Sequence, residues 1–307
     1  MTREPVAAID CGTNSIRLLI TAAGHDLVRE MRIVRLGRGV DRTGRLDPAA
    51  LERTRAALAD YRRLIDDHHV TRVRMVATSA TRDAENASDF HNMVMATLGQ
   101  PAEVITGEQE AALSFVGAVA GLSHHHHRSY LVVDIGGGST EFVRGTDLVE
   151  RSMSVDIGCV RMTERHLHSD PPTPGELEAA VADIGRAVGQ ALSYVDGKEH
   201  HLVGLAGSVT TVAGIALDLP HYDANRIHHS ILTAEAVEEI AARLSTLDHE
   251  QRAAIPVMHP GRVDVIIAGA LVLREIMRQT KAPEIIVSEH DILDGIASSI
   301  NTDGLKR

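Results

Sequence analysis

Apolar residues along the chain gather in short runs that end in small polar residues, and these runs alternate with segments of helical periodicity. The first run, VAAIDCGTNSIRLLI, has two apolar segments around a polar turn with a glycine, which predicts a hairpin of two strands. A helix is predicted further on, where Leu51, Leu58 and Ile65 recur at heptad spacing. Asp47 and Pro48 precede them and are typical of a helix N-cap and of the first helical position.

Other segments repeat this alternation. NASDFHNMVMATLG predicts a helix that ends at Gly99, and AEVITGEQEAALSFVGAVAG predicts a strand followed by a helix from about Glu108. HLVGLAGSVTTVAGIA and EIIVSEHDILDGIASSI each predict a strand, a turn and a helix, with Ser288 as the N-cap of the last helix. Strands that alternate with helices indicate an α/β fold with mixed or parallel sheets.

The chain also contains an internal similarity. Asp10, Gly12 and Ser15 of IDCGTNSIRLLI each have an identical residue 124 positions later (134 − 10), in VDIGGGSTEFVR. Apolar residues flank both turns, which indicates a duplicated module, although three identities in a short window also arise by chance. LAGSVTTVAG is a third segment of the same character.

Glycine, serine and threonine in such turns favour anion binding, because the backbone can curl until successive N–H groups point at one spot. Phosphate is the common occupant, and ordinary hairpin turns are the alternative. Asp10 and Asp134 stand near the ends of their strands, and Glu141 lies on the return strand. Carboxylates repel phosphate unless a cation intervenes, so we expect Mg²⁺ or Mn²⁺, with Asp134 and Glu141 as first-choice ligands and Asp10 as a further one.

Composition narrows the function classes. With 307 residues and 44% hydrophobic residues, the chain can bury a large core, and its length indicates about two domains. The net charge of −11 and the 2% aromatic content without tryptophan argue against nucleic-acid binding. Cys11 and Cys159 stand far apart and predict neither a disulfide framework nor a zinc site. The apolar runs are too short for a membrane span or a signal sequence, so we expect a cytoplasmic enzyme.

Six blocks carry a resemblance to a known family: AIDCGTNSIRLLI, ATSATRDAENASDF, ITGEQEAALSF, LVVDIGGGSTEFV, DIGCVRMTE and GLAGSVTTVAG. In this order they resemble the exopolyphosphatase and guanosine pentaphosphate phosphohydrolase family. The resemblance implies two ribonuclease-H-like lobes of the actin, Hsp70 and sugar kinase group around a central cleft. We expect one lobe in residues 1–113, with a C-terminal helix from 289–307 packing back on it, and the other in residues 114–288.

The resemblance also implies roles for individual residues. Glu110, in GEQEAA, would activate the attacking water, and Arg82, in TSATRDAEN, would clamp a phosphoryl group. The residues alone leave open a solvated first-turn glutamate and a surface ion pair. The implied phosphate channel is lined by three turns: Thr13, Asn14, Ser15, Gly136, Gly137, Gly138, Ser139, Gly207, Ser208 and Val209.

The expected activity is release of terminal orthophosphate from linear inorganic polyphosphate by Mg²⁺-assisted attack of water. Hydrolysis of pppGpp at the same site is the close alternative, and an ATP-dependent kinase or a non-catalytic polyphosphate or nucleotide sensor is less favoured. Longer family members carry a C-terminal helical extension that this sequence lacks, which weighs against a preference for very long polyphosphate.

Two further expectations concern assembly and metal binding outside the predicted site. Two-lobed folds of this kind often pair, so a homodimer is expected, although no stretch identifies the interface. The run His124–His127 is interpreted as a loop between the lobes, because contiguous histidines do not preset a tetrahedral metal site.

Overall fold

The chain divides into two compact units, which are described separately. The computed structural model describes residues 4–122, 129–196 and 200–303, so the predicted loop at His124–His127 lies outside the described residues. The first unit comprises Met1–Gly117 and Ile292–Arg307, and the second comprises Ala118–Asp291.

The first unit is built on a five-stranded mixed sheet with the strand order β3-β2-β1-β4-β5. Strands β1 to β3 are antiparallel neighbours, whereas β4 lies parallel to both β1 and β5. The strands are β1 (Val6–Cys11), β2 (Ser15–Ala22), β3 (His25–Ile33), β4 (Arg72–Ala77) and β5 (Glu103–Val104). The helices are α1 (Val40–Thr43), α2 (Pro48–Asp67), α3 (Ser79–Arg82), α4 (Ala87–Leu98), α5 (Gly107–Val119) and α13 (Ile292–Asp303).

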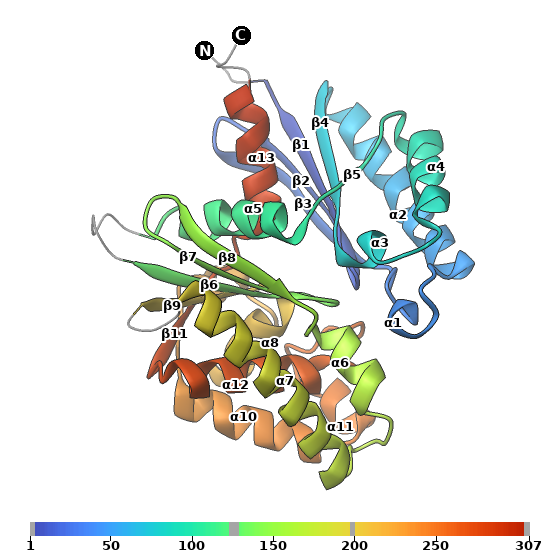
Figure 1. Ribbon diagram of the computed structural model, residues 1–307. Coiled ribbons are helices and arrows are strands. Elements are labelled where there is room, and N and C mark those ends of the chain that lie inside the picture. The colour runs from blue at the N-terminus through green and yellow to red at the C-terminus, as the bar shows by residue number, and fades with distance from the viewer. Residues whose placement is uncertain (1–3, 123–128, 197–199, 304–307) are drawn as a thin grey trace. The chain divides into compact units, whose positions relative to one another are not determined.

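Alternate residues of β1 face opposite sides of this sheet, as the pleat of a strand requires. Ala7 and Ile9 belong to a buried cluster with Tyr61 of α2 and residues of α4. Ala8 points to the other face and packs with Ile296 of α13. Figure 1 shows α2 and α4 on one side of the sheet and α13 on the other. Strand β1 is therefore buried on both faces, which explains its near-continuous apolar sequence.

The second unit repeats this plan with six strands in the order β10-β11-β9-β6-β7-β8. Strands β6, β7 and β8 are antiparallel neighbours, and β9 and β11 continue the sheet in parallel. The strands are β6 (Tyr130–Ile135), β7 (Thr140–Gly145), β8 (Val149–Val155), β9 (His201–Leu205), β10 (Ile231–Thr233) and β11 (Glu284–Val287). The helices are α6 (Cys159–His166), α7 (Pro174–Val195), α8 (Ala206–Ala216), α9 (Ala224–Ile227), α10 (Ala234–Thr246), α11 (His249–Ala253) and α12 (Ile266–Thr280).

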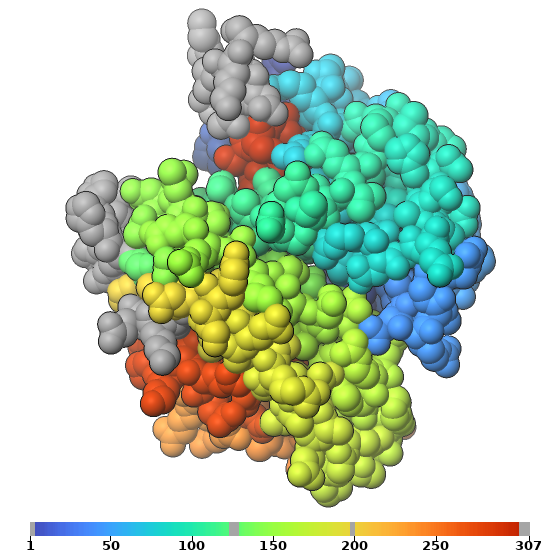
Figure 2. Space-filling model, viewed as in Figure 1, coloured from blue at the N-terminus to red at the C-terminus, as the bar shows by residue number. Residues whose placement is uncertain are grey.

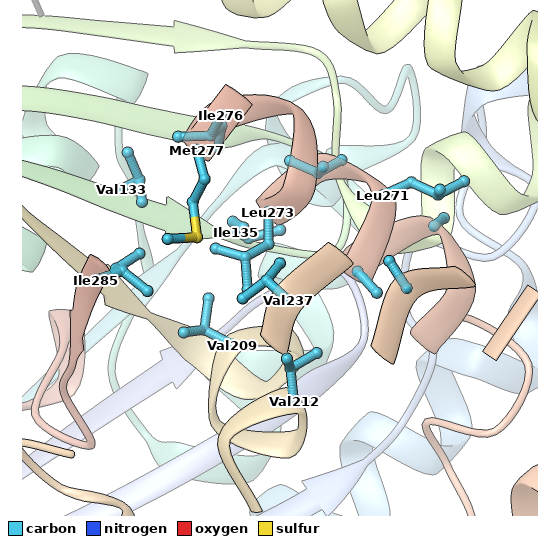
Figure 3. Packing of buried hydrophobic residues seen from close by; sticks show 14 of the residues in the cluster. Val133, Ile135, Val209, Val212, Val237, Leu271, Leu273, Ile276, Met277 and Ile285 are labelled. Atoms are coloured by element: carbon cyan, nitrogen blue, oxygen red, sulfur yellow. The ribbon is translucent and has the colours of Figure 1, made fainter. Parts of the chain in front are cut away.

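One large apolar cluster lies between this second sheet and its helices. Figure 3 shows side chains from β6, α8, α10, α12 and β11 meeting in it: Val133, Ile135, Val209, Val212, Val237, Leu271, Leu273, Ile276, Met277 and Ile285. A fully buried aliphatic side chain of this kind stabilises the fold by about 1.5–3 kcal/mol relative to an exposed one. Helix α7 covers the same core while its other side forms part of the outer surface in Figure 2.

The predicted α/β class with two ribonuclease-H-like units is confirmed, because each unit has an antiparallel trio of strands continued by parallel strands. Asp47 caps α2 by accepting hydrogen bonds from the amides of Ala49 and Ala50, and Pro48 is the first helical residue, as predicted. Gly99 ends α4 in the left-handed conformation, also as predicted. Within the described residues, every helix is too short or too polar to cross a bilayer.

Two local predictions were wrong. The segment at Gly207 is not a turn between a strand and a helix, because β9 passes directly into α8 at Ala206, which takes a φ of 67°. Ser288 does not cap the last helix, which begins at Ile292. Its hydroxyl instead donates to the carbonyl of His290 at 2.8 Å and forms a local turn.

Candidate active site

The turn between β1 and β2 is held by its main chain. The amide of Gly12 donates to the carbonyl of Ser15 at 2.9 Å. The carbonyls of Thr13 and Asn14 accept hydrogen bonds from the segment that follows β3, the first of them from Gly37 at 2.8 Å. In the described part of the chain, the amides of Thr13 and Asn14 donate to no main-chain acceptor. The carbonyls are thus occupied and the amides are left for a ligand, which is the arrangement that an anion nest needs.

Side chains of this turn extend the same polar surface. Thr13 Oγ1 lies 2.8 Å from Ser79 Oγ, at the start of α3. Asn14 is 8% exposed, and its Nδ2 has no hydrogen-bond partner among the described residues. A buried amide nitrogen without an acceptor costs free energy unless a ligand or water satisfies it. Asn14 therefore supports the interpretation of this turn as a binding site.

Arg82 and Glu110 form an ion pair in the same unit. Arg82 ends α3, and its Nη1 donates to Glu110 Oε2 at 3.2 Å and to the carbonyl of Ile105 at 2.9 Å. Glu110 lies in the first turn of α5 and is only 8% exposed, so the solvated glutamate that the residues alone left open does not occur. Ser79 and Arg82 both belong to the single turn of α3. Ser79 contacts Thr13 and Arg82 contacts Glu110, so α3 connects the Thr13 turn to Glu110.

The turn between β6 and β7 has the same main-chain geometry. The amide of Gly136 donates to the carbonyl of Ser139 at 3.0 Å. The carbonyl of Gly137 accepts from the amide of Val160 at 2.9 Å, and the carbonyl of Gly138 accepts from Arg161 Nε at 2.7 Å. The amides of Gly137 and Gly138 have no main-chain acceptor among the residues that the structure describes.

Gly158 lies just before α6 and allows the start of this helix to approach the β6–β7 turn closely. A Cβ atom at Gly158 would lie 2.3 Å from the carbonyl carbon of Gly137 and 2.5 Å from the nitrogen of Gly138. Two backbones therefore touch at this point, and only glycine permits the approach.

Asp134 and Glu141 are direct cross-strand partners on β6 and β7. Directly opposed residues of an antiparallel pair place their Cβ atoms about 4.5–5.5 Å apart. Asp134 is 7% exposed and Glu141 is 1% exposed, and Ser154 Oγ donates to Glu141 Oε1 at 2.7 Å. Two carboxylates so close and so buried repel each other unless they share a proton or a cation.

This acidic pair fits a magnesium ion, which prefers one or two carboxylates and completes its shell with water or phosphate oxygens. Groups of three or more histidine, cysteine or acidic side chains suited to a metal do not occur in the described part of the chain. A cation at Asp134 and Glu141 would therefore depend on water or substrate for its other ligands.

Asp10 has a different partner. Arg17 lies opposite it on β2, and Arg17 Nη2 and Nε approach Asp10 Oδ2 to 2.6 and 3.0 Å. The carboxylate is thus neutralised within its own hairpin. A role for Asp10 as a metal ligand stays a prediction.

Gly207, Ser208 and Val209 lie in the first turn of α8, where main-chain amides carry no helical partner. The guanidinium of Arg262 lies directly against Gly207, since a Cβ there would be 1.7 Å from Arg262 Cζ. Ser208 forms a hydrogen bond with the thiol of Cys159, which adjoins Gly158, so α8 and the Gly137 turn belong to one surface. Burial raises the pKa of this thiol, which keeps it protonated.

Sequence reasoning missed Ser79, Arg161 and Arg262. Ser79 lies in the motif ATSATRDAENASDF together with Arg82, and its hydroxyl group could have indicated a polar contact there. Arg161 and Arg262 contact glycines far from them in sequence, so no local pattern identified either residue.

Comparison with known proteins agrees with this geometry. The sequence profile of the Ppx/GppA phosphatase family matches residues 20–302. The chain belongs to this family. It is therefore a phosphatase by descent, and the predicted resemblance is confirmed.

Individual Ppx/GppA relatives match almost the whole chain. Exopolyphosphatase 2 of Mycobacterium tuberculosis strain H37Rv is 50% identical over 98% of this chain and 99% of that protein. The crystal structure of an exopolyphosphatase-like protein is 38% identical, with a TM-score of 0.94 over 97% of this chain and 99% of the other. The Ppx/GppA family member of Aquifex aeolicus is 32% identical, with a TM-score of 0.80 over 97% and 98%.

Proposed function

We propose that this protein is an exopolyphosphatase that releases terminal orthophosphate from linear inorganic polyphosphate. The observation that carries the proposal is the full-length similarity to exopolyphosphatase 2 of Mycobacterium tuberculosis, at 50% identity over 98% of the chain. Half of all positions are shared across both units, so the similarity is not limited to one motif.

Glu110 is the proposed general base. Its carboxylate is buried and is held by Arg82, and the first turn of a helix favours negative charge. In the proposed reaction it takes a proton from the water that attacks the terminal phosphorus atom, while the bond to the next phosphate breaks. A positioned carboxylate of this kind contributes typically 10²–10⁴-fold to a rate.

Arg82 is proposed to neutralise charge on the transferred phosphoryl group. Its Nη1 is committed to Glu110 and Ile105, and this contact fixes the direction of the guanidinium. Phosphoryl transfer needs mainly positioning and charge neutralisation from a protein, and a fixed arginine supplies both.

Asp134 and Glu141 would hold the magnesium ion. When bound, the metal neutralises phosphate oxygens and orients the phosphoanhydride. The chain's own contribution is the buried pair of carboxylates and the hydroxyl of Ser154, which orients Glu141.

Main-chain amide groups in each unit are proposed to bind phosphate: those of the Thr13 to Ser15 turn in the first unit, and those of the Gly136 to Ser139 turn and the first turn of α8 in the second. Each presents main-chain N–H groups that have no main-chain acceptor among the described residues. Arg262 adds a positive charge next to Gly207. The protein carries a net charge of −11, so such local donors are required for a polyanionic substrate.

Phosphate release from separate samples of short polyphosphate, long polyphosphate, pppGpp and ATP tests the proposal. We expect the fastest release from polyphosphate, with short chains used at least as well as long ones. Faster release from pppGpp would replace the proposed substrate by the guanosine pentaphosphate alternative, which the family name also includes. Release from ATP alone, or from none of the four, would overturn the proposal. A cytoplasmic location and a homodimer stay predictions.

A further inference from the structure

Three histidines of the second unit form a stack that the proposed reaction does not use. The ring centroids of His228 and His229 lie 3.7 Å apart with an interplanar angle of 28°, and those of His228 and His290 lie 4.5 Å apart. His229 Nε2 is buried without a hydrogen-bond partner among the described residues. Burial, and to a smaller extent His290, lowers the pKa of His229 below its ordinary value of 6.5.

The stack is joined to the first turns of α8 by a chain of hydrogen bonds. The amide of Glu289 donates to His228 Nδ1 at 3.2 Å. The hydroxyl of Tyr222 lies 2.6 Å from Glu289 Oε1 and 2.8 Å from Thr210 Oγ1. Thr210 follows Val209 directly in α8. The chain of contacts therefore runs from His228 to the helix that begins with the proposed phosphate-binding turn.

Tyr222 is suited to hold both ends of this connection. Burial and the neighbouring Glu289 raise its pKa, so the phenol keeps its proton throughout the physiological range. A carboxylate only accepts hydrogen bonds, so the Tyr222 hydroxyl donates its single proton to Glu289. The Thr210 hydroxyl then donates to the Tyr222 oxygen. Arg262 acts on the same phenol through its charge, which places Tyr222 beside the arginine that adjoins Gly207.

We propose that Tyr222 and Glu289 are positioning residues for the α8 phosphate-binding turn, and that the stack of His228, His229 and His290 makes this positioning dependent on protonation. The inference rests on the proposed function, because it concerns binding of polyphosphate at that turn. It adds a regulatory property, namely weaker substrate binding in acid.

The direction of the effect follows from the hydrogen bond at His228. Nδ1 accepts from Glu289 only while it carries no proton. When Nδ1 is protonated it becomes a donor and can no longer accept from the amide of Glu289. The hydrogen bond that joins His228 to Glu289, and through Glu289 to Tyr222, is then lost. Because the folded state lowers the pKa of His229, acidification through about pH 6.5 and below favours states in which the stack is opened.

Several of the described charged and titratable groups face the stack. His229 faces His228 from the same segment, His290 and Glu289 face it from the segment after β11, and Tyr222 precedes α9. Gly121, which follows α5 and belongs to the second unit, brings no charge to His229, and a Cβ there would lie 3.9 Å from His229 Cε1.

Substrate affinity at two pH values tests the inference. Short-chain polyphosphate is titrated into the full-length protein with Mg²⁺ by calorimetry at pH 8.0 and pH 5.5, in a Glu110→Gln background that prevents turnover. We expect Kd to rise about fivefold at pH 5.5, the effect of one ordinary hydrogen bond. His228→Asn should abolish this rise, since the asparagine oxygen accepts from Glu289 and does not titrate. Tyr222→Phe should give the weaker affinity at both pH values.

His91→Asn is the matched control, because His91 is an exposed histidine on α4, and it should retain the fivefold rise. An unchanged pH ratio in His228→Asn, or full affinity of Tyr222→Phe at pH 8.0, would overturn the inference. Phosphate release by the wild-type protein separates this outcome from failure of the proposed function. Binding with the expected pH ratio but without hydrolysis would overturn only the hydrolase proposal, and absence of binding would overturn both.

Discussion

The β1–β2 and β6–β7 hairpins share one backbone plan but differ in the charge that they place at matched positions. Each turn is closed by a main-chain hydrogen bond between residues three positions apart. The amide of Gly12 donates to the carbonyl of Ser15 at 2.9 Å, and the amide of Gly136 donates to the carbonyl of Ser139 at 3.0 Å. Asp10 and Asp134 stand at the same register position, and their cross-strand partners are Arg17 and Glu141. Because Arg17 is also 124 residues before Glu141 (141 − 17), the two pairs occupy equivalent sites of the duplicated module.

The difference shows how one module supports two tasks. In the first unit the arginine forms an ion pair with the aspartate, so this carboxylate has a cation within its own hairpin. In the second unit a glutamate takes the place of the arginine, so two carboxylates face each other, an arrangement that a bound cation or a shared proton stabilises. We therefore expect the metal in the second unit, and the proton transfer at Glu110 of the first.

The largest expected effect breaks the first unit's contribution. Glu110→Gln should lower kcat by about 10²–10⁴-fold, because the amide cannot take a proton from water. Polyphosphate binding should remain. Glu108→Gln, an exposed position on the same helix, is the matched control and should retain wild-type turnover. Near-wild-type phosphate release by Glu110→Gln would contradict the proposal that Glu110 is the general base.

The second effect concerns the acidic pair of the second unit. Glu141→Gln should raise the Mg²⁺ concentration needed for half-maximal activity by about 100-fold or more, since even outer-shell partners of a metal contribute 10–100-fold. Phosphate release after chelation and stepwise return of Mg²⁺ measures this. Wild-type protein should lose all activity on chelation. Activity that survives chelation would eliminate the metal assignment.

Arg17 sharpens the comparison through stability. Arg17→Gln should lower the free energy of unfolding by about 3 kcal/mol, because it leaves the buried Asp10 without its cation. Urea denaturation measures the change. Arg17→Glu gives the first hairpin the charge pattern of the second, and its stability should then increase with added Mg²⁺, whereas that of Arg17→Gln should not. Equal responses of both variants to Mg²⁺ would contradict the charge argument.

The smallest effect compares two helix caps. Asp47→Ala in α2 and Thr173→Ala in α7 should each cost about 1 kcal/mol of unfolding free energy. The α7 cap differs because hydrogen bonds, chiefly from the Thr173 backbone, lower the pKa of Glu176 from 4.5 to about 2. Its folded pKa is depressed, so the extra stabilisation is present above pH 4.5 and is lost as the pH falls toward 2. Denaturation of the wild-type and Thr173→Ala proteins at pH 7 and pH 3 should therefore show a smaller contribution of Thr173 in acid.

The parts of the site that could be predicted from sequence are those fixed by local chemistry. Glycine and hydroxyl residues predicted both hairpin turns, and the apolar runs around them predicted the strands. The role predicted for Glu110 required the family resemblance, because a first-turn glutamate is normally solvated.

Other parts depend on contacts between distant segments. Arg17 was not recognised as the partner of Asp10, because that pairing needs the strand register. The strand that precedes Ala206 enters a helix without a turn, and an alanine at a φ of 67° is not suggested by any sequence pattern. Arg262 reaches Gly207 across 55 residues (262 − 207), and tertiary packing alone brings them together.

The contact between Gly158 and Gly137 has a mechanical consequence. With no side chain between the two backbones, the turn and the beginning of α6 form a rigid joint. A movement of the turn would therefore require a movement of α6, which packs against the long helix α7.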